Sequence, residues 1–210
     1  MKTRLMKLAC LVAVASITVF SGCKKDNNLA GHEYVDLGLE SGTLWATTNL
    51  GANTPEEFGD YYAWGEITPK DSYTADNYTG NNNNLVRIFS NPIHDAATAN
   101  WGDDWRMPTI FDIEELASDC TWIMTTQAGV LGYKVVGPNG NSIFLPASGY
   151  YDGVTKEGVG TDVNCWTGNA STDPFDGNAI SLTISTNLPV AYAKTWENCY
   201  IGLTIRPVTD

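Results

Sequence analysis

Basic residues and histidine are scarce in this sequence. Its 210 residues hold 12 lysines and arginines against 24 aspartates and glutamates, and only two histidines. Such an excess of negative charge repels nucleic acid, and no basic cluster follows Lys24-Lys25 to offset it. His32 and His94 are far apart, and neither lies in a nucleophile–base arrangement, so surface or capping roles are expected. The sequence therefore excludes nucleic-acid binding and predicts no catalytic residues.

Long apolar runs are missing as well, apart from one near the N-terminus. Lys2, Arg4 and Lys7 precede the apolar run 8–20, which ends in Ser21-Gly22-Cys23. A charged, an apolar and a small-residue segment in this order are typical of a signal peptide. The run is too short to span a hydrocarbon core of ~30 Å comfortably.

Small residues before a cysteine suit a lipoprotein peptidase, although Phe20 replaces the usual aliphatic residue. We expect residues 1–22 to be removed, Cys23 to carry a lipid, and residues 23–30 to form a polar tether. Residues 31–210 then form a single domain. Several acyl chains on Cys23 would anchor the protein to a membrane. The alternative is an ordinary secretory signal in which Cys23 is incidental.

Cysteine is also infrequent, with five in the chain. Cys10 leaves with the signal and Cys23 is lipidated, which leaves Cys120, Cys165 and Cys199. Outside the cytoplasm one pair of these could form a disulfide, with one thiol left over. No Cys-x-x-Cys or Cys/His spacing is present, so the sequence predicts neither a zinc site nor any other cofactor.

Helical periodicity is rare, whereas 20 glycines, seven tryptophans and ten tyrosines indicate a fold rich in strands and loops. The one convincing helix begins after Pro108, where Thr109 and Asp112 form an approximate capping box. A shorter helical turn is expected at 95–100. The longer helix carries an apolar stripe made of Ile110, Ile113, Leu116 and Ala117.

Short strand-like runs separated by turn residues fill much of the remaining chain. An opening hairpin joins 34–39 to 43–47, and the clearest hairpin joins 132–136 to 141–145. A buried connection is expected at 61–66 and a surface loop at 71–84. Further strand-like runs lie at 164–166, 179–184, 190–192 and 200–208. We predict an α+β fold, with one or two helices on twisted, mostly antiparallel sheets and long loops.

Four stretches resemble a large family of Bacteroidetes lipoproteins, itself similar to the Fibrobacter succinogenes major paralogous domain. They are His32–Glu66, Asp95–Thr109, Gly137–Tyr150 and Ile205–Val208. The resemblance covers essentially the whole mature chain. It implies an outer-membrane lipoprotein, with the cell surface preferred and the periplasmic leaflet left open.

The most specific piece of this resemblance is Trp105-Arg106-Met107-Pro108-Thr109 running into an acidic helix. A similar element marks the sulfatase-modifying-factor relatives, which implies a C-type-lectin-like fold. In such folds these residues are structural: the Trp105 indole lies in the core and the Arg106 guanidinium bonds to backbone carbonyls. A ligand role is the alternative.

Two positions depart from the family pattern, with Glu40 in place of proline and Thr48 in place of cysteine. If relatives pair that missing cysteine with the counterpart of Cys120, then Cys120 is either unpaired here or paired with Cys165 or Cys199.

Aromatic residues among small polar ones gather in the C-terminal third. They are Trp166, Phe175, Tyr192, Trp196 and Tyr200. Aromatic anchors with polar neighbours suit carbohydrate or protein recognition, whereas alternate aromatics along strands also fill cores. The leading hypothesis is a non-enzymatic cell-envelope lipoprotein that binds a glycan or protein partner through the loops of this region.

Two other functions compete with it. A structural or assembly subunit of an envelope or pilus complex is the first. An oxidase of the formylglycine-generating fold is the second; it needs two cysteines near the C-terminal strand to bind copper, and only Cys199 lies just ahead of it. Trp196-Glu197-Asn198 weakly resembles a calcium element of C-type lectins, but its companion Glu-Pro-Asn is missing, so no metal site is predicted.

Overall fold

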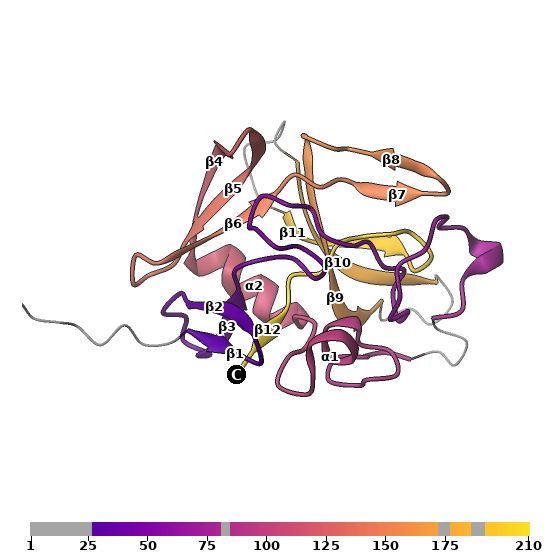
Figure 1. Cartoon of the computed structure of the whole chain (residues 1–210), viewed down its shortest axis with the longest axis horizontal. Helices are drawn as coiled ribbons and strands as arrows, with labels where there is room; N and C mark the ends of the chain where they lie inside the picture. The colour runs from indigo at the N-terminus through magenta and orange to yellow at the C-terminus, as the bar shows by residue number, and fades with distance from the viewer. Residues whose placement is uncertain (1–26, 81–84, 172–176, 186–191) are drawn as a thin grey trace, which may run out of the picture.

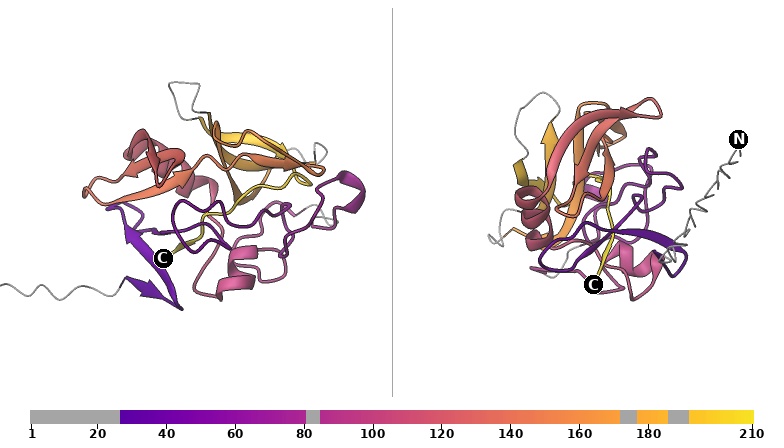
Figure 2. Two further views of the ribbon diagram at one scale, coloured as in Figure 1. Left: turned by 45° about the horizontal axis from the view of Figure 1, so that its top comes forward. Right: turned by 90° about the vertical axis from the view of Figure 1, so that its left-hand side faces the viewer.

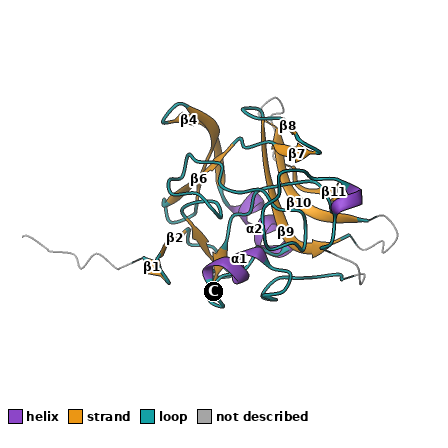
Figure 3. Cartoon of the chain, turned by 45° about the vertical axis from the view of Figure 1, so that its right-hand side comes forward, coloured by secondary structure: helices purple, strands orange, loops and turns teal. Residues whose placement is uncertain are grey.

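The computed structural model describes residues 27–80, 85–171, 177–185 and 192–210. Antiparallel strand pairs dominate it, and two α-helices lie among them (Figures 1 and 3). This arrangement confirms the expected mixture of few helices with mostly antiparallel sheets. The predicted signal segment and Cys23 lie outside the described residues. No helix in the described part of the chain has the length and apolarity needed to cross a membrane.

The two ends of the described chain meet in one small sheet. It contains β1 (Asn28–Leu29), β2 (His32–Asp36), β3 (Leu44–Ala46) and β12 (Val208–Thr209), in that order. β2 and β3 form the predicted opening hairpin, and Val208 of β12 pairs with Trp45 of β3. Figure 2 shows the C-terminus beside these first strands. The closing strand therefore locks the opening hairpin in place.

The main helix, α2 (Ile110–Asp119), begins where its capping residues predict. Thr109 Oγ1 accepts a 3.2 Å hydrogen bond from the Asp112 N–H, and the Asp112 carboxylate accepts a 2.6 Å bond from the Thr109 N–H. These reciprocal bonds satisfy donors that a helix start leaves open. The helix buries Ile113 and Leu116 and lies against β9 and β11, so the predicted helix and its apolar stripe are confirmed.

The shorter helix, α1 (Ala96–Trp101), confirms the helical turn expected near residues 95–100. Its N-cap is Asp95, whose carboxylate accepts 2.8 and 3.1 Å bonds from the backbone N–H groups of Ala97 and Thr98. The same carboxylate also accepts from the N–H of Met107, so α1 is fixed to the segment leading into α2.

A three-stranded sheet follows α2. It consists of β4 (Thr121–Gln127), β5 (Val130–Val136) and β6 (Ser142–Pro146), and β5 with β6 is the hairpin predicted around residues 137–140. The sequence gives no clear sign of β4. Its neighbouring residues Ile123 and Met124 point to opposite faces and are both exposed, so the alternation that marks a half-buried strand is missing.

The C-terminal third forms a second three-stranded sheet. Its order is β11 (Tyr192–Asn198), β10 (Asn178–Ser185) and β9 (Asp162–Ala170), beside a small hairpin of β7 (Tyr150–Asp152) and β8 (Thr155–Glu157). The runs predicted at 164–166 and 179–184 lie inside β9 and β10. The strand expected at 200–208 is wrong in extent, because only Val208 belongs to β12. The rest makes isolated bridges such as Tyr62–Leu203 and Cys165–Thr204.

Residues 61–66 form the predicted buried connection. Tyr61, Tyr62 and Trp64 are at most 5% exposed, and the Trp64 indole donates a 2.8 Å bond to the carbonyl of Thr167. The expectation of a plain surface loop at 71–84 is wrong at Tyr73, which is only 1% exposed. Its ring packs against Tyr151, which anchors this loop to the β7–β8 hairpin.

Candidate functional site

Polar side chains form a continuous ladder across one face of the β9–β10–β11 sheet. Cross-strand pairing places Thr183 opposite Asn164 and Ser181 opposite Thr195. The oxygens of Ser181 and Thr195 are 2.7 Å apart, Thr195 donates a 2.8 Å bond to Thr183, and Thr183 donates a 2.8 Å bond to Asn164 Oδ1. We call these four residues the hydroxyl ladder. Their spacing follows from the strand repeat, since residues two apart share a face.

The ladder ends on an amide nitrogen that lacks a partner. Asn164 is 3% exposed, and its Nδ2 is buried with no hydrogen-bond partner among the described residues. Exchanging the oxygen and nitrogen of this amide leaves the other atom unpaired instead. Buried polar atoms in folded proteins almost always have a partner, so this position favours a water molecule or a ligand hydroxyl.

Two further polar residues of this region, Glu197 and Tyr150, are half-buried. Glu197 is two residues from Thr195 on β11 and therefore shares its face, and burial raises the pKa of its carboxyl group. Burial also raises the pKa of Tyr150, and the nearby carboxylates of Glu157 and Glu197 raise it further. The region offers hydrogen-bond donors and acceptors, and its described residues include no nucleophile–base pair.

Side chains are described for three of the five predicted ligand-binding aromatics, and these three differ in burial. Trp166 is fully buried, and its indole donates a 2.7 Å bond to the carbonyl of Tyr62. A buried indole offers no surface to a ligand, so Trp166 has the core role that was the alternative. The reason is the position of β9, whose Trp166 side packs on the buried 61–66 connection.

Trp196 differs from Trp166, because 54% of its side chain is exposed on β11. It is paired with Ile180 and lies on the face opposite Thr195, away from the hydroxyl ladder. Tyr200 is half-buried against the core that also contains Trp166. Phe175 lies outside the described residues, and of Tyr192 only the backbone, at the start of β11, is described.

The Trp105–Thr109 element occupies the positions of a structural motif. Trp105 is fully buried and its indole donates a 3.2 Å bond to the carbonyl of Leu29, while Pro108 is buried too. The expected bonds of Arg106 to backbone carbonyls are confirmed only at Met107, whose carbonyl oxygen accepts a 3.4 Å bond. The Arg106 guanidinium bonds chiefly to the carboxylates of Asp112, at 2.7 Å, and Asp210, at 2.6 Å. A carboxylate is the stronger partner for this cation, which explains the preference.

The two histidines do not meet. His32, expected at the surface, is half-buried, and its ring stacks on Trp101 with the ring centres 3.7 Å apart. Burial lowers the pKa of His32. His94 Nδ1 lies 3.2 Å from the carbonyl oxygen of Gly65.

The three cysteines of the described chain form no disulfide, so the pairing of Cys120 with Cys165 or Cys199 is wrong. Burial raises the pKa of the Cys165 thiol and raises that of Cys120 to about 11. Thiols of this kind are poorly reactive. The described residues contain no group of three or more histidine, cysteine or acidic side chains placed to hold a metal ion.

Comparisons of the chain with protein-family models, characterised proteins and solved structures found no match. The proposals below therefore depend on the geometry of this molecule and on the residues that carry the family resemblance.

Proposed function

We propose that this chain is a non-enzymatic cell-envelope lipoprotein with a C-type-lectin-like fold that binds a glycan through its C-terminal sheet. The observation that carries the proposal is the hydroxyl ladder with its unpartnered amide nitrogen at Asn164. Anchoring through a lipid on Cys23 is part of the proposal. It is supported by the signal-like order of residues 1–23, and the outer membrane is the expected location.

A glycan suits the ladder because sugars and ladder residues have the same hydrogen-bonding groups. Serine and threonine hydroxyls both donate and accept, and an asparagine amide does the same with two atoms. Thr183 and Thr195 are half-buried, whereas Ser181 and Asn164 are at most 3% exposed, so a sugar would meet the two threonines first. The half-buried Glu197 carboxylate can accept from a sugar hydroxyl. A protein partner would instead be expected to meet an apolar, aromatic patch at the centre of its interface.

A glycan array followed by titration of the bound glycan tests this function. Thr195→Val keeps the shape of the side chain and removes its hydroxyl, and a hydrogen bond contributes about 1 kcal/mol, so affinity should fall about fivefold. Thr155→Val, an exposed threonine on β8, is the matched control and should leave affinity unchanged. No bound glycan, or equal affinity of the Thr195 variant and the wild type, would contradict the proposal.

A second function, that of an assembly subunit, is favoured by the edge strand β4. Its sequence, TWIMTTQ, has no charged residue, and within the described residues its outer edge has no backbone partner. Charged residues or proline usually protect such an edge from pairing with another chain. Met124→Lys should therefore abolish co-purification with envelope complexes if β4 is an assembly surface, and leave glycan binding intact.

An oxidase activity is the third candidate function. Cys165 lies on β9 and Cys199 directly follows β11, and both are buried. The copper content of the purified protein distinguishes this activity from the other two.

A further inference from the structure

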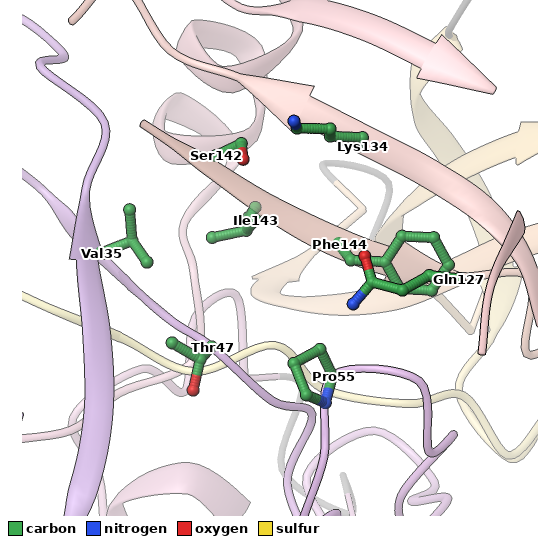
Figure 4. Close-up of a pocket in the computed structure, with 8 residues that line it drawn as sticks. All are labelled: Val35, Thr47, Pro55, Gln127, Lys134, Ser142, Ile143 and Phe144. Carbon is green, nitrogen blue, oxygen red and sulfur yellow. The ribbon is translucent and has the colours of Figure 1, made fainter. Parts of the chain in front are cut away.

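A small pocket lies between the opening hairpin and the β4–β5–β6 sheet, away from the hydroxyl ladder. Its volume is about 240 Å³, below the range of pockets that hold drug-sized ligands. Figure 4 shows Lys134 and Ser142 along one side and Thr47 and Pro55 along the other, with Ile143 between them. Three separate segments of the chain therefore enclose it.

The floor of the pocket is apolar and fixed. Ile143 is 3% and Phe144 is 4% exposed, and Val35 packs against the same core. The Phe144 ring lies close to Gly132 on the neighbouring strand, and it fits there because glycine has no side chain. A Cβ at position 132 would lie 2.7 Å from the ring and 2.3 Å from the Leu145 carbonyl oxygen. A rigid apolar surface of this kind suits a compact hydrocarbon group.

The rim of the pocket is positive, which is unusual in a chain with a net charge of −12. The ammonium of Lys134 has no carboxylate partner within the described residues, and no acidic side chain lines the pocket. Behind the wall, the buried guanidinium of Arg206 bonds to the backbone carbonyls of Thr47 at 3.0 Å and Phe144 at 2.9 Å.

Two other surface pockets have the opposite character. Glu114, Glu115 and Asp119 line one of them, and Asp103 and Asp104 line the other. An anion entering either would meet carboxylates, whereas an anion entering the Lys134 pocket would meet a lysine that is not already neutralised.

One carboxylate lies just beyond the far end of the Lys134 pocket. Glu56 accepts a 2.5 Å bond from the side-chain amide of Gln127, a lining residue, and this bond lowers the pKa of Glu56. The charge of the pocket is therefore polarised. The end formed by Lys134 and Ser142 is the positive one.

We propose that this pocket binds a small organic carboxylate with a compact apolar body. The carboxylate pairs with the Lys134 ammonium and accepts from the Ser142 hydroxyl, while the apolar body rests on Val35 and Phe144. This binding site is separate from the proposed glycan site, since the pocket shares no residue with the hydroxyl ladder. Lys134 and Phe144 are direct cross-strand neighbours, so the charged and apolar parts of the site are held at a fixed separation.

Titration of the ¹⁵N-labelled protein with isovalerate, followed by amide chemical shifts, tests the site. Isovalerate has about seven non-hydrogen atoms, so a dissociation constant of about 1 mM is expected. The shifts should centre on Val35, Lys134, Ser142 and Phe144. Neutral isovaleramide should bind at least threefold more weakly, since it lacks the charge, and glucuronate should also bind more weakly, since its body is polar.

Variants separate a charge effect from a loss of structure. Lys134→Met should weaken isovalerate binding about threefold or more, since ion pairs at exposed sites are modest, and Lys134→Arg should retain it. Lys156→Met removes another exposed lysine, on β8, and is the matched control. Ser142→Leu places a larger side chain in the pocket and should abolish binding.

Three results would overturn the proposal: equal binding of isovaleramide, tighter binding of glucuronate, or shifts that centre elsewhere on the protein. Thr195→Val should leave isovalerate binding unchanged. Failure of the pocket and failure of the glycan proposal are therefore distinguishable.

Discussion

Two arginines, the half-buried Arg106 and the buried Arg206, hold the C-terminal segment in opposite ways. Arg106 pairs with the carboxylates of Asp112 and Asp210, and its backbone bridges to Val208. Arg206, two residues before Val208, is 1% exposed and forms no ion pair within the described residues. Its guanidinium instead donates four hydrogen bonds to neutral oxygens. The positive charge of Arg106 is therefore balanced by carboxylates, whereas that of Arg206 is stabilised by the dipoles of neutral groups.

The pKa values of the two groups reflect this difference. Burial lowers the pKa of both, but the bonds that Arg106 donates to Asp112 and Asp210 outweigh burial there, so the pKa of Arg106 is raised. At Arg206 burial wins and lowers the pKa to about 10, so the group is still protonated at neutral pH. A buried cation without a counter-charge is costly, and it is retained here because it joins distant segments.

The segments joined by Arg206 are far apart in the sequence. Nε donates a 2.8 Å bond to Asn49 Oδ1, Nη1 donates 3.0 Å bonds to the carbonyls of Ala46 and Thr47, and Nη2 donates a 2.9 Å bond to the carbonyl of Phe144. The opening hairpin, the loop after it, β6 and the C-terminal segment therefore meet at a single side chain.

The largest effect is expected for Arg206→Met. The four oxygens lose their donors, each lost bond costing about 1 kcal/mol or more, while removal of the buried charge gives part of this back; we expect a net loss of about 4 kcal/mol. Urea unfolding of the purified protein measures it. A variant as stable as the wild type would show that the bonds from Arg206 to neutral oxygens do not stabilise the fold.

A smaller loss, about 3 kcal/mol, is expected for Arg106→Met, because Asp112 keeps its bonds from Thr109 but loses its counter-charge. Adding Asp112→Asn should recover part of that loss. A double-mutant cycle should give a coupling energy of about 1–3 kcal/mol. Additive effects of the two substitutions would contradict the assignment of Arg106 to a charge-compensated site.

Acid should weaken only the Arg106 centre. Burial raises the pKa of Asp112, but the bonds from Arg106 and Thr109 outweigh it, so the folded-state pKa is lower than the unfolded value. The carboxylate therefore stabilises the fold above its unfolded pKa of about 4, and this contribution is lost as pH falls through the folded value. The stability difference between wild type and Asp112→Asn should shrink below about pH 4.

The corresponding difference for Arg206→Met should stay constant over the same pH range, because none of the described carboxylates pairs with Arg206. Unfolding free energies measured at several pH values check both variants. Equal acid sensitivity of the two differences would show that the two centres are not electrostatically distinct.

The same contrast explains which features the sequence could predict. The α2 start depends on Thr109 and Asp112, three residues apart, and the β5–β6 hairpin depends on a four-residue turn. Local signals of this kind were predicted correctly. The Arg206 centre joins residues up to 160 positions apart, and no local pattern encodes such contacts.

The candidate sites follow the same rule. The aromatic content of the C-terminal third predicted a recognition surface, but the burial of Trp166 depends on packing against the distant segment 61–66. The hydroxyl ladder depends on the register of three strands, which places Asn164, Thr183 and Thr195 in one line. Alternating polar residues in β10 are the one signal in the sequence that could have indicated it.

The smallest effect is expected for Asp210→Asn, which removes the exposed one of the two carboxylates that pair with Arg106. The Asp210 side chain is 73% exposed, so solvent and salt screen its 2.6 Å ion pair with Arg106, and the loss should be at most about 1 kcal/mol. High salt should remove most of that loss while leaving the effect of Asp112→Asn, because the Asp112 side chain is only 6% exposed. Unfolding in urea at low and high sodium chloride measures both. A loss at Asp210 that persists in high salt would mean that the ion pair is shielded from solvent, and that both carboxylates hold Arg106 equally.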